Sequence, residues 1–292
     1  MTTVGFIGLG LMGTGFTKRL AATGHTVIGY DVDPGKVAAA AAWGVEPARS
    51  PADAIRRADI VAICVTTTAA VEAVATGEDG LLSAGRLDGK TVVDFSTTEI
   101  AATHRVATAL AGAGAAFIDA PVSGGPGAAE GGTLAIMAGG DAGAVERARP
   151  MLEKLGLVTH MGGTGAGQAT KLVNQALCLT NYVVVAEGLR LAEAYGVDAR
   201  KIPEALAPGL ANSAVLQAVY PRMVEKDFAP RGYARQVLKD LEMLHEATRA
   251  QHLALPMTAL ATTLFRILVG QGKGELDGAA VVTLIPEPET PH

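Results

Sequence analysis

Cysteine, long apolar runs and clustered positive charge are all scarce in this sequence of 292 residues. The two cysteines, Cys64 and Cys178, lie far apart in apolar surroundings, so a disulfide framework is excluded and buried free thiols are expected. No apolar stretch reaches the roughly 20 residues that a membrane span requires, so no transmembrane helix is predicted. The histidines show no metal-ligand spacing and no C-x-x-C motif occurs, so we expect no metal.

The charge pattern excludes a second class of protein. The formal net charge is −5, and no run of lysine and arginine exceeds two residues, which is not the pattern of a nucleic-acid-binding protein. The charge pattern does not exclude the binding of a small anion at a local site. The sequence enters an apolar strand at Val4–Ile7 without a basic region or a cleavage site, which predicts a cytoplasmic location.

The first half of the chain alternates short apolar, β-branched runs with alanine-rich stretches, a pattern typical of repeated strand-helix units in a parallel sheet. Most of the runs are apolar throughout, as strands covered on both faces should be. The predicted strands are 4–7, 26–30, 60–64, 91–93, 116–118, 134–137 and 157–160, and the predicted helices are 14–22, 34–42, 100–111 and 142–155.

The pattern changes after Gly163. No proline interrupts residues 165–195, which predicts one helix of about 45 Å at 1.5 Å per residue. Further helices are predicted at 199–206, 213–223, 234–251 and 256–270, with a last short helix from Asp277. The predicted fold is therefore an α/β Rossmann dinucleotide-binding domain, residues 1–163, followed by an all-α domain, residues 164–292, with residues 164–195 as the long interdomain helix.

A glycine-rich turn follows the first predicted strand. Gly8, Gly10 and Gly13 form the motif G-x-G-x-x-G, with Leu11 and Met12 inside it. Glycines tighten such a turn and let backbone N–H groups approach a pyrophosphate at a helix N-terminus, where the helix dipole favours negative charge. We therefore expect residues 8–13 to bind a dinucleotide.

An acidic residue should follow about 20 positions later, at the end of the second strand. Asp31 occupies that position, followed by Val32 and Asp33. A carboxylate accepts hydrogen bonds from ribose hydroxyls and repels a 2′-phosphate, and no arginine follows to hold that phosphate. NAD is therefore predicted rather than NADP.

Three blocks of sequence together carry a resemblance to a known family. They are GFIGLGLMG at 5–13, DAPVSGGPGAAEGGTLAIMAGG at 119–140 and GAGQATKLVNQ at 165–175, with a weaker fourth block, Lys239-Asp240-Leu241. With these blocks the chain resembles the β-hydroxyacid dehydrogenases, a family that includes 3-hydroxyisobutyrate dehydrogenase and tartronate semialdehyde reductase. The resemblance extends from Gly5 to about Leu284.

The resemblance implies roles for particular residues. Ser123, Gly124 and Gly125 would bind the substrate carboxylate, a role that fits a hydroxyl and two glycine N–H groups after a strand, although a plain β-turn is the alternative. Lys171 would give a proton to the carbonyl oxygen during reduction and take it back during oxidation, and Asn174 would orient the same substrate. These two are three apart on one predicted helix face.

That predicted helix face also bears on how Lys171 works. Gly167 lies one turn before Lys171, and we expect it to leave room for substrate or nicotinamide. No carboxylate lies among the helix neighbours of Lys171 at 167–175, which is compatible with the lowered pKa of a lysine that exchanges protons near neutral pH.

Carried over by position, Thr97 and Lys239 would help to hold the cofactor. Val65 and Thr66 stand where many members have Leu-Pro, so we expect the backbone contact to the adenosine side without the rigidity of proline. Arg231 replaces part of a family motif and could contact substrate, but we expect its side chain to be solvated.

Several readings stay open. The predicted substrate is a small β-hydroxy acid or its semialdehyde, either 3-hydroxyisobutyrate-like or, in the alternative, tartronate semialdehyde or another small aldehyde such as succinic semialdehyde. Gln175 favours the tartronate enzymes, whereas Asp31 without an adjacent arginine favours the 3-hydroxyisobutyrate enzymes. A homodimer or homotetramer is expected.

Three other readings fit the residues less well. Decarboxylating relatives place a carboxylic acid where Cys178 stands, seven residues after the lysine. Imine reductases generally replace the lysine that this chain keeps as Lys171. A non-catalytic NAD-binding regulatory module would lose Lys171 or the Ser-Gly-Gly turn, and both are present.

Overall fold

The computed structural model describes residues 2–288 and divides into two compact units, Met1–Lys171 and Leu172–His292. Each unit has its own apolar core. The described part of the chain thus consists of an α/β unit and a helical unit, as the sequence predicts, and each is described by itself.

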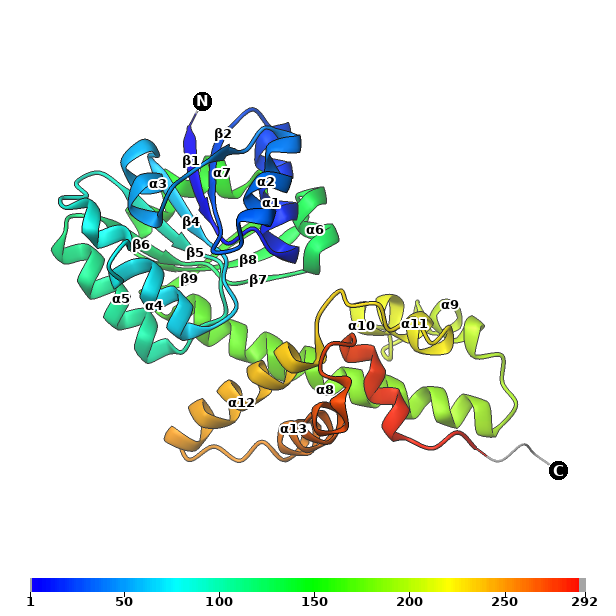
Figure 1. Cartoon of the computed structure of the whole chain (residues 1–292). Coiled ribbons are helices and arrows are strands. Elements are labelled where there is room, and N and C mark those ends of the chain that lie inside the picture. Colours follow the sequence, from blue (N-terminus) through cyan, green and yellow to red (C-terminus); the bar gives the residue numbers. More distant parts are fainter. Residues whose placement is uncertain (1, 289–292) are drawn as a thin grey trace. The chain divides into compact units, whose positions relative to one another are not determined.

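The first unit is built on one sheet (Figure 1). Its strands are β1 (Thr3–Ile7), β2 (Thr26–Tyr30), β3 (Glu46–Pro47), β4 (Ile60–Ile63), β5 (Thr91–Asp94), β6 (Ala116–Asp119), β7 (Val122–Ser123), β8 (Leu134–Gly140) and β9 (Gly156–Gly162). Its helices are α1 (Leu11–Ala22), α2 (Pro34–Ala40), α3 (Pro51–Arg57), α4 (Thr68–Thr76), α5 (Ile100–Gly112), α6 (Gly125–Gly131) and α7 (Ala142–Leu152), and α8 (Ala166–Ala194) begins in it. Short 3₁₀ turns lie at Ala41–Trp43 and Leu81–Ala84.

The strand order is β3-β2-β1-β4-β5-β6-β8-β7, with β9 paired to β8. The prediction of a parallel sheet is correct from β3 to β6 and again for the pair β8 and β9. It is wrong where β8 runs antiparallel to β6 and to β7. In that antiparallel register Asp119 lies opposite Gly139. A Cβ at Gly139 would lie 2.6 Å from Asp119 Oδ1, so the glycine allows β8 to lie close to Asp119. The sequence pattern did not predict this pairing.

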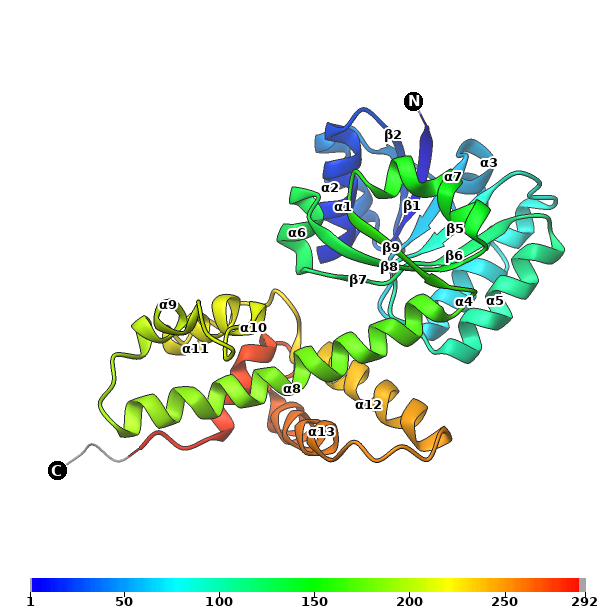
Figure 2. The ribbon, with the colours of Figure 1, turned by 180° about the vertical axis from the view of Figure 1, so that it is seen from behind.

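Helices cover both faces of the sheet because alternate strand residues point to opposite faces. Val4 and Phe6 of β1 belong to one apolar cluster, which also contains residues of α1, α2, α6 and α7, whereas Ile7 belongs to a second cluster with residues of α3, α4 and α5. Figure 1 shows α3, α4 and α5 together, and Figure 2 shows α7 over the other face. The sheet is therefore buried on both sides.

The second unit is helical. Besides most of α8 it contains a 3₁₀ turn at Ala199–Lys201, α9 (Ile202–Leu206), α10 (Ala214–Ala218), α11 (Tyr220–Val224), α12 (Ala234–Ala250), α13 (Pro256–Leu268), a π-helical turn at Val269–Lys273 and a 3₁₀ helix at Gly278–Leu284. On α8, Leu179, Val183 and Ala186 recur at helical spacing and pack in the apolar core with Tyr220 and Phe265.

The predicted helices need two kinds of correction. The single helix expected at 213–223 is two, because Pro221 opens α11 after the break at Val219. Helices α3, α4 and α6 were not predicted. Two of them carry a sequence signal, since Ser50 and Thr67 accept hydrogen bonds from the backbone N–H groups of Asp53 and Ala70 as N-caps. All three are short, so their apolar periodicity is weak.

Candidate active site

The glycine turn has the geometry that dinucleotide binding requires. Gly8 has a φ of 99°, and a Cβ there would lie 2.2 Å from the carbonyl oxygen of Cys64. A Cβ at Gly13 would lie 1.9 Å from the carbonyl oxygen of Gly8, whereas one at Gly10 would meet no atom within 4 Å. The first and third glycines therefore allow backbone to pack on backbone, and the second leaves the N-terminus of α1 open to a phosphate.

Asp31 lies beside this turn. Its Oδ2 accepts a hydrogen bond from the Leu9 N–H at 2.7 Å and its Oδ1 accepts one from the Asp33 N–H at 2.9 Å. A carboxylate has about four lone-pair sites, so these bonds orient Asp31 and still leave acceptor capacity for ribose hydroxyls. The structure thus brings together Asp31 and the glycine turn, as the sequence predicts.

An open pocket of about 540 Å³ adjoins Asp31. Its lining is mostly apolar and includes one cation, Arg49. A second cation, Lys36, does not line the pocket, but its Nζ lies 3.7 Å from Asp31 Oδ1. The lining residues are Tyr30, Asp31, Val32, Pro34, Val37, Ala38, Ala41, Pro47, Ala48 and Arg49. An adenosine would find apolar contacts here next to the Asp31 carboxylate.

A buried polar network lies where β4, β5 and β6 end. Asp94 Oδ1 accepts from the Ser96 N–H at 2.9 Å, and Ser96 Oγ in turn accepts from the Val65 N–H at 3.0 Å. Gln168 of α8 joins the network, because its Oε1 accepts from the Thr98 N–H and its Nε2 donates to the Ser96 carbonyl. The backbone N–H of Val65, a predicted cofactor contact, is therefore already engaged by Ser96.

Two carboxyl groups in this network are shielded from water. Burial raises the pKa of Asp94 to about 7 and raises the pKa of Asp119 above its usual range. Asp119 accepts hydrogen bonds from the N–H groups of Gly165 at 2.8 Å and Gln168 at 2.9 Å. The Asp119 carboxyl group thus satisfies N–H groups at the start of α8 that have no partner within the helix. The sequence pattern did not predict this role of Asp119.

Gly167 has a role other than the predicted one. We expected this glycine to leave room for substrate or nicotinamide, but a Cβ there would lie 2.3 Å from the Met137 carbonyl oxygen and 2.4 Å from that of Asp119. The space beside Gly167 is filled by the backbone of β8 and β6. The glycine allows the start of α8 to pack directly on the sheet.

That packing sets the position of Lys171. Its side chain is 8% exposed, and Nζ donates a hydrogen bond to the Val122 carbonyl at 2.7 Å. Val122 immediately precedes Ser123, so the structure brings the predicted proton-transfer residue next to the predicted carboxylate-binding turn. The sequence analysis considered only the helix neighbours of Lys171, which include no carboxylate. The structure adds a backbone carbonyl, that of Val122, which accepts a hydrogen bond from Nζ.

Ser123, Gly124 and Gly125 do not form a plain β-turn. Ser123 ends β7, and Gly124 and Gly125 lead into α6 with φ values of 133° and 75°. No side chain caps α6 at Gly124. Successive N–H groups in such a conformation can form a concave anion-binding site.

In the second unit, Asn174 belongs to a chain of polar side chains. Asn174 Nδ2 donates to Gln175 Oε1 at 2.8 Å, and Gln175 Nε2 donates a short hydrogen bond to Asp240 Oδ2. Asp240 Oδ1 lies 2.9 Å from Lys239 Nζ. The structure thus links Asn174 to Lys239, two predicted site residues that lie far apart in sequence, through Gln175 and Asp240, which were not predicted.

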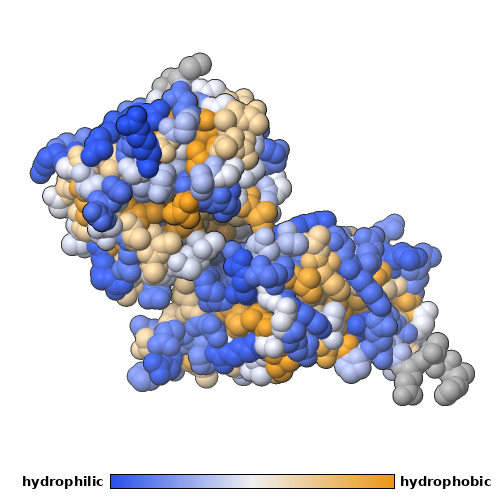
Figure 3. Space-filling model, in the orientation of Figure 1, coloured by the Kyte–Doolittle hydropathy of each residue, from blue (hydrophilic) through white to orange (hydrophobic). Residues whose placement is uncertain are grey.

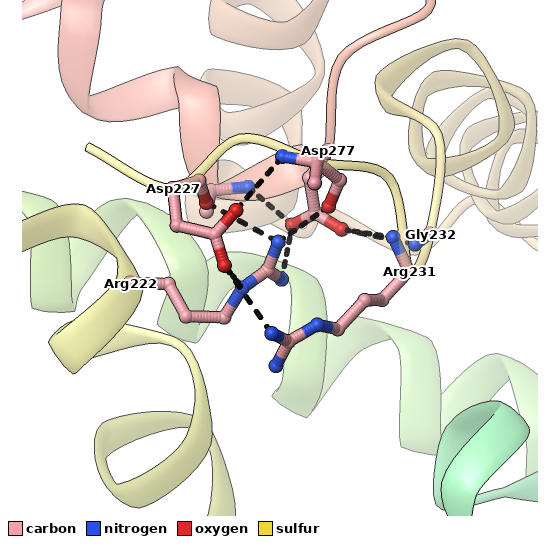
Figure 4. Close-up of polar contacts among 7 residues, drawn as sticks. Arg222, Asp227, Arg231, Gly232 and Asp277 are labelled. Atoms are coloured by element: carbon pink, nitrogen blue, oxygen red, sulfur yellow. Dashed lines mark hydrogen bonds and ion pairs between the residues drawn. The ribbon is translucent and has the colours of Figure 1, made fainter. Parts of the chain in front are cut away.

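A buried ion pair holds the segment before α12 (Figure 4). Arg222 and Asp277 are 6% and 1% exposed and lie 2.9 Å apart between guanidinium and carboxylate. Asp277 Oδ2 also accepts from the N–H groups of Arg231 and Gly232. The Arg231 guanidinium itself is 64% exposed and pairs with Asp227 at 3.2 Å, which agrees with the expectation that this side chain is solvated.

The remaining predicted residues have simpler surroundings. Thr66 is exposed and Thr97 is half-buried. We expected both cysteines to be buried, but each residue is half-buried. The thiol of Cys64 is nevertheless shielded from water, and this burial raises its pKa to about 12. Within residues 2–288, no three His, Cys, Asp or Glu side chains cluster as a metal site would require.

Comparison with known proteins agrees with this geometry. Residues 3–163 match the family model described as the NAD binding domain of 6-phosphogluconate dehydrogenase, and residues 165–285 match that described as NAD-binding of NADP-dependent 3-hydroxyisobutyrate dehydrogenase. Among curated relatives, 2-hydroxy-3-oxopropionate reductase of Escherichia coli is 39% identical over 96% of this chain and 95% of its own length. The chain belongs to the β-hydroxyacid dehydrogenase family.

Two further relatives extend this finding. The NAD-dependent L-serine dehydrogenase of Pseudomonas aeruginosa is 35% identical over 97% of this chain and 98% of its own length. A structure of Mycobacterium tuberculosis 3-hydroxyisobutyrate dehydrogenase with L-serine has a TM-score of 0.86 at 32% identity, covering 98% of this chain and all of that one. This member of the family is therefore an NAD-binding oxidoreductase that acts on CH–OH groups of small molecules.

The long helix requires one more comment. Among the described residues, α8 is the helix that is long and apolar enough to cross a membrane by length and composition. A third of its most apolar window is buried in the protein, and Leu179, Val183 and Ala186 pack in the core of the helical unit. We interpret α8 as a core helix.

Proposed function

We propose that this enzyme interconverts a small β-hydroxy acid and its semialdehyde with NAD, and that Lys171 moves the proton. The observation that carries the proposal is the buried Lys171 side chain, whose Nζ lies 2.7 Å from the Val122 carbonyl oxygen next to Ser123. A proton-transfer group is thereby fixed beside a turn suited to a carboxylate. In this proposal residues 1–163 are the NAD-binding domain, and residues 164–292, which begin with the long connecting helix 164–195, are the substrate and dimerisation domain.

The roles of the residues follow from their chemistry. Ser123, Gly124 and Gly125 bind the substrate carboxylate, and Asn174 orients the substrate. The cofactor is held by Gly8, Gly10, Leu11, Met12, Gly13, Asp31, Val65, Thr66, Thr97 and Lys239. When bound, NAD accepts the hydride that leaves the hydroxyl-bearing carbon.

Lys171 takes the hydroxyl proton as the carbonyl forms, so it must be neutral at the start of oxidation and protonated at the start of reduction. The rate of oxidation should therefore fall at low pH and the rate of reduction at high pH.

The test is a substrate panel with the purified enzyme. NAD with 3-hydroxyisobutyrate, glycerate, serine and 4-hydroxybutyrate is assayed by the absorbance of the reduced nicotinamide, and we expect oxidation of at least one. Tartronate semialdehyde and succinic semialdehyde are assayed in the reverse direction as the alternative substrates. A protein that turns over none of them but binds NAD would instead be a regulatory module.

Cofactor choice is a separate test. Asp31 favours NAD, while Lys36 and Arg49 near the pocket provide positive charge that could tolerate a 2′-phosphate. We expect tighter binding of NAD than of NADP in titration, and Asp31→Ser with Val32→Arg should reverse the order. Tighter NADP binding by the unmodified protein would contradict this assignment.

We further propose that no carbon dioxide is released. Cys178 stands where decarboxylating relatives have a carboxylic acid, and a thiol in this place is a poor substitute for that acid. Stoichiometric carbon dioxide from a β-hydroxy acid would contradict this part of the proposal.

We also propose that the enzyme is a cytoplasmic homodimer or homotetramer that associates through α8. Large apolar side chains are exposed along this helix, and the largest exposed fractions are those of Val173, Leu177 and Leu191, at 59%, 70% and 62%. Figure 3 shows apolar surface interrupting the polar surface of the helical unit. Exposed apolar stripes of this kind mark association surfaces, so Leu177→Glu should lower the mass measured by light scattering, whereas the polar change Thr263→Glu on α13 should not.

A further inference from the structure

Helix α6 is joined to the rest of the fold through glycines. The residues on either side of it, Gly124 and Gly132, have φ values of 133° and 71°. Of the residues in α6 itself, only Ala129 is buried. The position of this short helix, and of the Ser123-Gly124-Gly125 turn that leads into it, therefore depends mainly on the element that packs beside it.

That element is α1, and Figures 1 and 2 both show the two helices side by side. The contact is close at Gly15 of α1. A Cβ at Gly15 would lie 2.8 Å from the Pro126 carbonyl oxygen, 3.0 Å from the Ala129 Cβ and 3.1 Å from the Glu130 backbone nitrogen. Three residues further along α1, Lys18 Nζ lies 3.3 Å from Glu130 Oε1. The glycine thus allows the main chain of α6 to lie directly against α1.

A side chain at position 15 would displace α6 rather than α1. Helix α1 is packed on the sheet through Phe16 and Leu20, which are both 0% exposed, and a Cβ at Gly13 would already meet the Gly8 carbonyl oxygen. Two of the three nearest atoms to a Cβ at position 15 belong to the main chain of α6 and cannot move by a change of rotamer. The helix that yields is therefore the short one with glycines at both ends.

We propose that Gly15 is a positioning residue, which sets the place of the Ser123-Gly124-Gly125 turn relative to the dinucleotide turn at residues 8–13 through the contact of α6 with α1. The two turns lead into these two helices, since α1 begins at Leu11 and α6 at Gly125. This inference rests on the proposed function, in which the turns bind the substrate carboxylate and the cofactor pyrophosphate. A residue that binds neither anion then determines how far apart the two are held.

The variant that tests the inference is Gly15→Ala. Calorimetry on the NADH-bound enzyme measures the affinities for glycerate and 3-hydroxyisobutyrate, and a separate titration measures that for NADH. For each acid that the wild type binds, we expect the dissociation constant to rise about 10- to 100-fold, because a displacement of about 1 Å can cost about 10²-fold. The dissociation constant of NADH should stay nearly unchanged, since α1 keeps its place.

Hydrogen exchange provides a readout that needs no substrate. In Gly15→Ala, exchange should become faster at residues 123–132 and should not become faster at residues 11–22. Gly77→Ala is the matched control, because a Cβ there would lie 2.4 Å from the Ala73 carbonyl oxygen. Gly77 ends α4, which packs on the opposite face of the sheet from α6. This control should lose stability and keep the wild-type acid affinity and the wild-type exchange of α6.

A second variant covers the case in which Gly15→Ala does not fold. Gly15→Ala combined with Ala129→Gly conserves the volume between the helices, a kind of change that cores tolerate well. It keeps the new methyl group against the Pro126 carbonyl, so we expect the same pattern with a smaller magnitude.

Two results would overturn the inference. One is a folded variant whose acid affinity and α6 exchange are those of the wild type. The other is a variant in which the affinity for NADH falls as much as that for the acids, because α1 rather than α6 would then have moved. Failure of the proposed function would look different: the wild type would oxidise no acid, whereas the exchange of residues 123–132 would still decide whether Gly15 holds α6.

Discussion

The two units of this enzyme fix their functional residues by different means. In the α/β unit, glycines at Gly8, Gly13 and Gly167 let backbone pack on backbone in the dinucleotide turn and at the start of α8. The carboxylates of Asp31 and Asp119 then accept hydrogen bonds from backbone N–H groups there. In the helical unit, side chains do this work, through the ion pair of Arg222 and Asp277 and the chain from Asn174 to Lys239. The first arrangement tolerates few changes, whereas the second can be altered one residue at a time.

The printed names of the relatives fit this difference. They match this chain over nearly its whole length, yet one is named for 2-hydroxy-3-oxopropionate and another for L-serine. A rigid cofactor unit combined with a side-chain-based helical unit would allow substrate preference to change while the cofactor site stays the same.

The largest effect is expected at Lys171, on the rate rather than on the fold. Lys171→Ala should lower kcat by about 10² to 10⁴, because it removes the general acid-base group, and should change the NAD dissociation constant only a few-fold. Asn174→Ala should cost less and should raise KM, since it orients substrate in both ground and transition states. Steady-state kinetics and NAD titration measure these effects.

Lys90 provides the control for Lys171. Its Nζ also donates to a backbone carbonyl, that of Ala58, at 2.6 Å. Lys90→Ala should therefore reproduce the structural loss without the loss of rate. A Lys171→Ala enzyme with near-wild-type turnover would remove the proposed mechanism.

The buried ion pair tests how the helical unit depends on side chains. Arg222→Met should lower the free energy of unfolding by about 3 to 5 kcal/mol, because it leaves the Asp277 carboxylate buried without its cation. Arg231→Met removes an exposed arginine from the same cluster and should cost about 0 to 1 kcal/mol. Denaturant unfolding gives the magnitudes, and hydrogen exchange should locate the change within residues 172–288. Equal effects of the two substitutions would contradict the contrast drawn here.

The glycine turn tests the backbone packing of the α/β unit. Gly13→Ala should cost about 2 to 4 kcal/mol through overpacking against the Gly8 carbonyl, with increased hydrogen exchange in β1 and α1. Gly10→Ala has open space around its new methyl group, so it should leave stability unchanged and weaken NAD binding by obstructing the approach of the pyrophosphate. Comparable losses of stability in both variants would show that the steric argument is wrong.

The smallest effect concerns Asp94 and depends on pH. Burial raises the pKa of this carboxyl to about 7 in the folded enzyme, so the folded state binds the proton more tightly than the unfolded state does. The stability from this group is present at low pH and is lost as pH rises toward about 7. Asp94→Asn keeps an acceptor for the Ser96 N–H and cannot ionise. It should therefore gain on the order of 1 to 3 kcal/mol over the wild type at pH of about 8 but not at about 5, as measured by urea unfolding.

The sequence predicts the elements that repeat a strong local pattern. Strands β1, β2 and β4 and the long helix α8 come out within a residue or two, because apolar runs and uninterrupted helical spacing determine them locally. A strand is also predicted at 134–137, but its extension to Gly140 and its antiparallel direction are not, since they involve the pairing of Gly139 with the distant residue Asp119. The division of residues 213–223 into two helices also depends on a single proline whose effect local periodicity does not show.

The candidate site shows the same division. Motif spacing proposes Gly8, Gly13 and Asp31 as site residues, and the resemblance of the block at 165–175 proposes Lys171. Motif spacing misses Asp119 as the group that satisfies the first N–H groups of α8, because the hydrogen bonds join residues some 46 to 49 positions apart. It also assigns Gly167 to substrate space, since spacing on a helix says nothing about which backbone lies opposite.

The contacts of Gly167 also bear on directed evolution of this enzyme. A library that randomises residue 167 to enlarge the substrate site would mainly return unfolded proteins, because the neighbours of a new side chain are two main-chain carbonyls that cannot change rotamer. Mutational scanning under selection for folding alone should already deplete substitutions there, whereas Asn174 and Gln175 should tolerate change until substrate use is selected. Libraries intended to change specificity are therefore better placed beyond Lys171 on α8, at positions such as Asn174 and Gln175.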